Sequence, residues 1–266
     1  MNRVDTIDFP LVDSSYDNQE IIRCFETILS GQLTMGPRVR EFEEVFCETI
    51  GASYGLMVNS GSSANLLALS AITNPTRPRR LLPGDKVAIP AVCWSTSLWP
   101  IIQNGLIPVL VDVDPDTLNM SMRSLHDALS RHTVKALMLV HILGNATELG
   151  ELMVLARERD LLVIEDTCES LGSRFRGQYL GTLGEFGTFS FYFSHHMTTI
   201  EGGFVVTKTQ ADCDLLKCLR THGWSREQSN RAELELQNPK IDPRFLFINA
   251  GYNVRPMEVV GCHVVS

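Results

Sequence analysis

Short apolar runs alternate with helix-like stretches along most of this chain, and this alternation limits the folds open to it. Seven runs have the length and composition of buried strands: Tyr54–Val58, Lys86–Ile89, Pro108–Val113, Ala136–Val140, Leu161–Ile164, Thr188–Phe193 and Phe204–Thr207. Helical patterns lie between several of them: Ser63–Ala71, Ser95–Asn104, Ser124–Leu129 and Glu148–Arg159. The alternation predicts an α/β domain with a mainly parallel sheet that is covered on both faces.

Two helical patterns, Asn18–Leu29 and Val39–Ile50, precede the first strand, and a glycine follows each of them. At the other end of the domain the last two strands are joined by a loop through Glu201, so their relative direction stays open. Segment Ser225–Pro243 is polar and predicts an exposed loop. Met257–Val265 begins an apolar helix, and the sequence stops there without a capping signal.

These patterns predict two regions. We expect a large α/β domain over residues 1–225, and a polar excursion followed by the start of a truncated C-terminal region over residues 226–266. A hydrophobic content of 44% and a charged content of 20% fit a soluble globular enzyme better than a disordered tail.

Charge and local composition exclude several functional classes. The formal net charge of -8 argues against nucleic acid as the main partner. No stretch reaches the ~18 apolar residues of a membrane helix, and the N-terminus lacks the apolar core of a secretory signal. We therefore expect a cytoplasmic protein without a membrane partner. The seven scattered cysteines form no Cys-x-x-Cys pair, so we expect reduced thiols and no metal site.

Two motifs at expected strand ends indicate a site for a phosphorylated ligand. The turn Asn59–Ser63 opens a helix directly after a strand, and a Gly-Ser-Ser helix start offers N–H groups and hydroxyls to a phosphate. A helix start that is merely capped is the alternative. Glu165 and Asp166 end a buried strand, where a carboxylate can pair with a cationic ring nitrogen. The alternative is that both acids cap a following helix.

Two further motifs carry an imidazole and an indole. His195 and His196 stand at a strand end, and an imidazole is the natural proton shuttle near neutral pH. Metal binding and purely structural histidines are the alternatives, although neighbouring side chains on an extended segment point apart. Trp94 follows another strand and is either a stacking surface for a planar cofactor or a core aromatic. No Gly-x-Gly-x-x-Gly follows the first strand, which disfavours a dinucleotide site.

At these motifs the chain resembles the DegT/DnrJ/EryC1/StrS sugar aminotransferase family. The resemblance runs from Leu33–Pro37 to Gly251–Pro256 and implies the aspartate aminotransferase-like fold, fold type I of pyridoxal-phosphate enzymes. It also implies a smaller C-terminal domain, which is largely missing here. In ordinary members a lysine bonds to the cofactor six residues before the Glu-Gly-Gly turn, and this chain has His195 there. The chain's lysines stand elsewhere, at positions 86, 135, 208, 217 and 240.

The histidine resembles that of a subgroup of this family, the sugar 3-dehydratases. That resemblance implies removal of the C3 hydroxyl from a GDP- or CDP-linked 4-keto-6-deoxyhexose, a step towards the 3,6-dideoxysugars of lipopolysaccharide O-antigen. It implies pyridoxal 5′-phosphate and its pyridoxamine form as cofactors, glutamate as amino donor and a homodimer. The sequence lacks Cys-x-Cys, so no iron–sulfur cluster is expected. A sugar aminotransferase-like protein and an inactive truncated binding subunit remain alternatives.

The resemblance also implies roles for individual residues of the cofactor site and of the reaction. The implied cofactor-binding residues are Gly61, Ser62 and Ser190 at the phosphate, Trp94 stacked on the ring, Asp166 at the ring nitrogen, Glu169 near the ring hydroxyl, and Asn253 from a second subunit. The implied catalytic residues are His195 as the base, Asp166, Glu169, and His222 near the substrate.

Overall fold

A seven-stranded sheet forms the centre of the computed structural model, which describes residues 17–146 and 149–264. The strand order is β1-β9-β8-β5-β4-β2-β3. The strands are β1 (Tyr54–Val58), β2 (Lys86–Pro90), β3 (Ile107–Val111), β4 (Val134–Val140), β5 (Leu162–Asp166), β8 (Phe186–Ser190) and β9 (Gly203–Thr207). Neighbours from β8 to β3 pair in parallel, whereas β9 runs antiparallel to both β8 and β1. The mainly parallel sheet is confirmed, and the last two strands are antiparallel.

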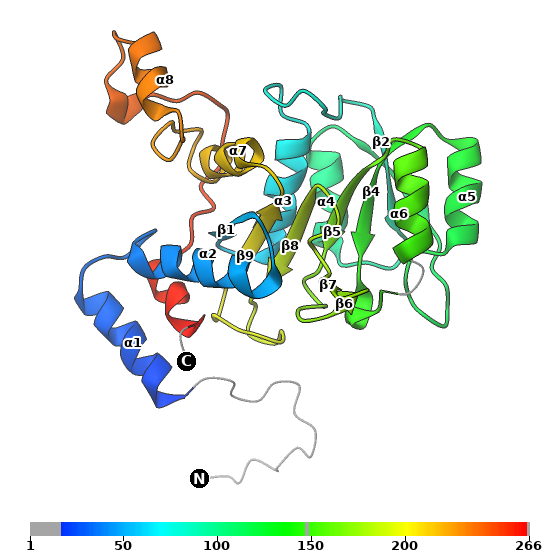
Figure 1. Cartoon of the computed structure of the whole chain (residues 1–266), viewed down its shortest axis with the longest axis horizontal. Coiled ribbons are helices and arrows are strands. Elements are labelled where there is room, and N and C mark those ends of the chain that lie inside the picture. The colour runs from blue at the N-terminus through cyan, green and yellow to red at the C-terminus, as the bar shows by residue number, and fades with distance from the viewer. Residues whose placement is uncertain (1–16, 147–148, 265–266) are drawn as a thin grey trace.

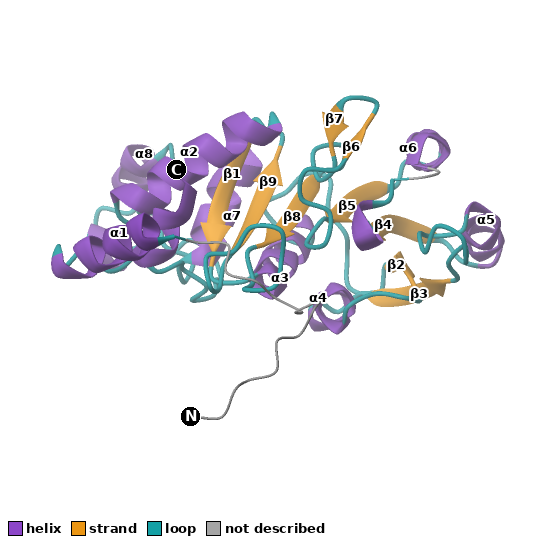
Figure 2. Cartoon of the chain, turned by 90° about the horizontal axis from the view of Figure 1, so that it is seen from below, coloured by secondary structure: helices purple, strands orange, loops and turns teal. Residues whose placement is uncertain are grey.

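Helices cover both faces of this sheet (Figures 1 and 2). One face packs against α3 (Gly61–Ile72), α4 (Ser95–Gln103) and α7 (Gln210–Arg220). The other face packs against α2 (Pro37–Ile50), α5 (Met122–Arg131) and α6 (Leu149–Glu158). Val163 and Ile164, neighbours on β5, enter different cores because successive side chains of a strand point to opposite faces.

The N-terminal helix α1 (Asn18–Leu29) stands apart from the sheet and lies beside the last described segment, η3 (Glu258–Val264) (Figure 1). Asp17 and Glu20 form a reciprocal capping box at its start. Phe25 and Leu29 of this helix are 62% and 85% exposed, so α1 presents apolar side chains to its surroundings. No helix within residues 17–146 and 149–264 is long and apolar enough to cross a membrane.

Two expectations for the C-terminal part of the chain differ from the structure. The polar segment Ser225–Pro243 is largely exposed as expected, but it contains the helix α8 (Arg231–Gln237). An ion pair between Arg231 and Glu235, one helical turn apart, supports this helix without an apolar stripe. The expected apolar helix at the C-terminus is the short 3-10 helix η3, and Val265 lies outside the described residues.

The other differences concern short elements. A two-stranded hairpin, β6 (Arg174–Phe175) and β7 (Gln178–Tyr179), was not expected, nor were the 3-10 turns η1 (Ile142–Gly144) and η2 (Pro243–Phe245). The strand expected to reach Phe193 ends at Ser190. Glu148, the expected start of the helix that is now α6, lies outside the described residues.

Candidate active site

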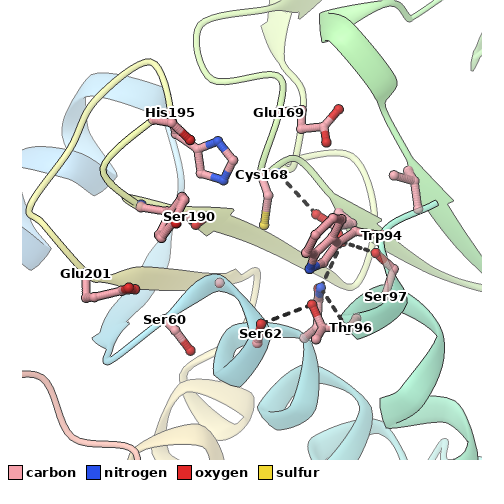
Figure 3. A pocket seen from close by; sticks show the side chains of 16 residues that line it. Ser60, Ser62, Trp94, Thr96, Ser97, Cys168, Glu169, Ser190, His195 and Glu201 are labelled. Carbon is pink, nitrogen blue, oxygen red and sulfur yellow. Dashed lines mark hydrogen bonds between the residues drawn. The ribbon is translucent and has the colours of Figure 1, made fainter. Parts of the chain in front are cut away.

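A cavity of about 470 Å³ opens at the carboxyl ends of β5 and β8, beside the N-terminus of α3 (Figure 3). This is the edge of an open α/β sheet where ligands bind, and the volume suits a small cofactor with part of a substrate. Seven of the nine predicted site residues line it: Gly61, Ser62, Trp94, Asp166, Glu169, Ser190 and His195. The structure therefore brings together side chains that lie up to 134 positions apart, from Gly61 to His195.

The N-terminus of α3 forms one wall of the cavity. Ser60 caps the helix by accepting a hydrogen bond from the Ser63 N–H, at 3.1 Å. A Cβ atom at Gly61 would lie 2.6 Å from Cβ of Ser190, so only glycine allows β8 to approach this closely. Ser62 donates a hydrogen bond to the Thr96 hydroxyl at 3.0 Å, and both side chains line the cavity. The helix start is therefore capped, and the side chain of Ser62 also lines the cavity.

Asp166 is 5% exposed and is held by three hydrogen-bond donors. Its Oδ2 accepts from Asn65 Nδ2 at 2.8 Å and from Ser97 Oγ at 2.7 Å. Its Oδ1 accepts from the Cys168 backbone N–H at 3.1 Å. No helix follows β5 directly, so the alternative that this acid caps a helix is wrong.

His195 lies in the loop after β8, and Figure 3 shows its imidazole pointing into the cavity. Its backbone N–H donates to the Tyr192 carbonyl at 2.9 Å, which closes a tight turn. Burial lowers the pKa of His195, and the neighbouring His196 lowers it further. The carboxylates of Glu169 and Asp166 raise it, but the net pKa lies below the ordinary histidine value. The imidazole is therefore neutral near pH 7 and can accept a proton.

The indole of Trp94 stands at the start of α4 and is 70% exposed. A core position is thereby ruled out, because a core aromatic is largely inaccessible to solvent. Glu169 is also exposed, on the opposite side of the cavity mouth from α3 (Figure 3). Both side chains are accessible to a ligand that enters the cavity.

His222 and Asn253 do not line this cavity. They lie close together elsewhere, because Thr221 and Asn253 form an isolated backbone bridge and the His222 N–H donates to the Tyr252 carbonyl. The imidazole of His222 packs edge-on against Trp224, with ring centroids 5.4 Å apart. Asn253 is exposed, and its Oδ1 accepts from Arg255 Nε at 3.0 Å.

Sequence reasoning missed several residues of the cavity wall. They are Ser60, Asn65, Thr96, Ser97, Val140, Cys168, Tyr192, Ser194 and Glu201. Five of these nine residues stand within two positions of a predicted site residue, so closeness in sequence is a signal that could have found them. Asn65 gave only a weak signal, as an amide one turn into an apolar helix.

Glu165 ends β5 beside Asp166 but has a different environment. It is fully buried and accepts hydrogen bonds from His141 Nε2 at 3.2 Å and from the Gly181, Leu183 and Gly184 N–H groups. Burial alone would raise the pKa of Glu165, but the bonds from His141, Gly181 and Gly184 lower it below the ordinary value. Glu165 is thus a satisfied internal anion.

Two kinds of group are missing from this site. None of the five lysines, all within the described ranges, lines the cavity. Across residues 17–146 and 149–264, no cluster of three or more His, Cys, Asp and Glu side chains is placed to hold a metal ion.

Residues 14–263 match the DegT/DnrJ/EryC1/StrS aminotransferase family. The chain belongs to this family. A GDP-4-keto-6-deoxy-D-mannose 3-dehydratase from Escherichia coli O55:H7 is 39% identical over 257 residues, which cover 96% of this chain and 66% of the relative. The family resemblance stated from the motifs is confirmed, and its similarity to proteins named 3-dehydratases is confirmed as well.

Two solved structures extend the comparison. The E. coli GDP-4-keto-6-deoxy-D-mannose-3-dehydratase with bound hydrated PLP superposes with a TM-score of 0.89 at 38% identity. A GDP-4-keto-6-deoxymannose-3-dehydratase with a trapped PLP-glutamate geminal diamine superposes with a TM-score of 0.88 at 37% identity. Each match covers 96% of this chain and 66% of the other chain, so the chain spans about two thirds of these relatives. The expected fold class is confirmed.

Proposed function

We propose that this chain binds a vitamin B6 phosphate and takes part in removing the C3 hydroxyl of a nucleotide-linked 4-keto-6-deoxyhexose. One observation carries the proposal: His195, and no lysine, enters the cavity that also contains Asp166 and the α3 N-terminus. An aminotransferase needs an amine at this place to tether its cofactor, and an imidazole cannot supply one. Two relatives are named 3-dehydratases, and the match with this chain covers about two thirds of the length of each.

The cavity wall fits pyridoxal phosphate without a covalent bond. Gly61, Ser62 and Ser190 form a concave wall at a helix N-terminus, which suits the phosphate. The carboxylate of Asp166 is held by Asn65, Ser97 and the Cys168 N–H, and a carboxylate there suits a protonated ring nitrogen. The exposed indole of Trp94 offers a stacking surface.

When bound, the pyridoxamine form supplies an amine that condenses with the sugar's C4 ketone and a ring that accepts electrons. His195, neutral at pH 7, removes the proton from the C4′ carbon. As an imidazolium it then protonates the departing C3 hydroxyl, so that water leaves. Acid–base help of this kind contributes about 10²–10⁴-fold to a rate.

Further parts of the proposal come from the family resemblance. Glu169 acts near the ring hydroxyl, His222 near the substrate, and Asn253 reaches the cofactor of a second subunit in a homodimer. The location of Asn253 outside its own chain's cavity supports that assignment. We propose a cytoplasmic protein with a cofactor-binding region over residues 1–225 and a C-terminal region over residues 226–266.

The nature of the product tests this function. The purified chain is incubated with pyridoxal phosphate, glutamate and GDP-4-keto-6-deoxymannose, and the sugar is followed by mass spectrometry. We expect a product that lacks one oxygen, with one 2-oxoglutarate and one ammonia formed per turnover. A 4-amino sugar would instead show an aminotransferase.

A second candidate is a binding subunit that has lost turnover, because no lysine lines the cavity where an aminotransferase tethers its cofactor. The same experiment separates the two. Pyridoxamine phosphate that binds tightly while the sugar stays intact would favour the binding subunit. The CDP-linked sugar, tested in parallel, shows which nucleotide the protein accepts.

A further inference from the structure

Asn65 is a buried amide on an otherwise apolar part of α3, and the function proposed above does not use it. The residue is 1% exposed and points from the first turns of α3 towards the end of β5. Its Nδ2 donates to Asp166 Oδ2 at 2.8 Å and lies 3.3 Å from the Thr96 carbonyl. A buried polar side chain on an apolar helix costs free energy unless its hydrogen bonds are made, so its partners explain its presence.

The orientation of this amide is fixed by a second partner. Thr188 on β8 donates its hydroxyl to Asn65 Oδ1 at 2.6 Å. The oxygen of the amide therefore faces Thr188, and the nitrogen faces Asp166. Because Thr188 is fully buried and held on a central strand, the amide has one favourable orientation.

Ser97 approaches the same carboxylate oxygen from another helix. Its hydroxyl, fully buried at the start of α4, donates to Asp166 Oδ2 at 2.7 Å. Two donors thus occupy Oδ2, whereas Oδ1 accepts from the Cys168 backbone N–H. A carboxylate oxygen can accept two bonds, so the capacity that remains is on Oδ1.

We propose that Asn65 and Ser97 are positioning residues that clamp Oδ2 of Asp166, so that Oδ1 is presented to the ring N–H of a bound B6 phosphate. The inference rests on the proposed cofactor, and it assigns to two side chains the task of holding the Asp166 carboxylate in the correct orientation. Hydrogen bonds to a charged group are among the stronger ones in proteins, so each donor matters.

The test compares two ligands that differ only at the ring nitrogen. Pyridoxal phosphate and its 1-deaza analogue, which has carbon in place of that nitrogen, are titrated into the cofactor-free full chain, and Kd is measured from absorbance. For the wild type we expect tighter binding of pyridoxal phosphate. In Asn65→Leu we expect its Kd to rise about tenfold or more, with the Kd of the analogue changed less than about twofold.

A matched variant and a milder variant keep the test decisive. Asn74→Leu removes a buried amide of similar size that bonds Asn249 away from the cavity, so neither Kd should change. Ser97→Ala removes only one hydroxyl and should raise the Kd of pyridoxal phosphate about threefold, with little change for the analogue. Thermal unfolding of each variant shows whether it folds. If Asn65→Leu does not fold, the result for Ser97→Ala decides whether the inference holds.

The possible failures are distinguishable. If the variants weaken both ligands equally, Asn65 and Ser97 only shape the cavity, and the inference is overturned while the cofactor assignment stands. If the wild-type chain binds neither ligand, the proposed function fails and this inference falls with it.

Discussion

Glu165 and Asp166 are neighbours at the end of β5, yet they occupy opposite environments. Glu165 faces the core side of α5 and α6 and is enclosed by His141 and by backbone N–H groups of the Gly181–Gly184 turn. Asp166 faces α3 and α4 and borders the cavity. Alternation along a strand places one acid in a closed polar cluster and the other at an open site.

The difference between the two acids distinguishes a structural carboxylate from a functional one. Both have several hydrogen bonds, so bonding alone does not separate them. Glu165 receives four donors on two oxygens, which uses its accepting capacity internally. Asp166 receives three and retains capacity beside the cavity. Substitution of each acid should therefore affect a different property of the protein.

The largest effect is expected for Asp166→Asn. Loss of the charge opposite the ring nitrogen should lower kcat/KM about 10³-fold. The free energy of unfolding should fall by only about 1 kcal/mol, because the amide keeps most of the contacts. Steady-state kinetics and urea unfolding measure the two quantities. Activity within tenfold of the wild type would show that Asp166 does not hold the ring.

Glu165→Gln should have the opposite profile. An amide nitrogen placed against two backbone N–H groups should lower the free energy of unfolding by about 3 kcal/mol. The folded fraction should bind pyridoxal phosphate within about twofold of the wild-type Kd. Urea unfolding measures the free energy, and titration with pyridoxal phosphate at low temperature measures the Kd. A strong loss of affinity in a well-folded variant would remove the distinction between the two acids.

The pH dependence of kcat/KM sharpens the account of the open site. The pKa of His195 is lowered, chiefly by burial, so its basic form persists to a pH below the ordinary histidine value. The activity should fall with acidification only as pH drops through that lowered pKa. Glu169→Gln removes a carboxylate that raises this pKa, so the acid limb should move to still lower pH. A shift to higher pH would contradict this electrostatic assignment.

The smallest effect concerns acid stability. The pKa of Glu165 is lower in the folded chain than its ordinary value of 4.5, so its contribution to stability is complete above that pH. As pH falls through the folded pKa, the contribution is lost. The difference in unfolding free energy between wild type and Glu165→Gln should therefore narrow below about pH 4.5. A constant difference would mean that charge is not the source of the effect.

The sequence was a good guide to elements with strong periodicity. Strand β1 and helix α1 have the expected bounds, because a short apolar run marks the strand and the Asp17 cap marks the helix. Strand β8 ends three residues early, since Tyr192 and Phe193 look strand-like but turn outwards and are 39% and 45% exposed. Helix α8 lacks an apolar stripe, so periodicity could not reveal it.

The candidate site was predictable in part. Seven predicted residues line the cavity because each one ends a strand, follows a strand or stands at the start of a helix, and parallel strands bring these ends together. The hydrogen bond from Asn65 to Asp166 was not predictable. The two residues are 101 positions apart, and only the packing of α3 on the sheet brings them together. Hydrogen-bond partners so distant in sequence leave no local pattern.

Borohydride reduction tests the central claim most directly, namely that His195 serves a B6 phosphate held without a covalent bond. The wild-type chain and His195→Lys are each loaded with pyridoxal phosphate, reduced, digested and analysed by mass spectrometry. For the wild type we predict that no peptide retains the cofactor after denaturation. For the variant we predict one cofactor bound covalently at position 195. A reduced cofactor attached to a wild-type lysine, or none attached in His195→Lys, would contradict the account.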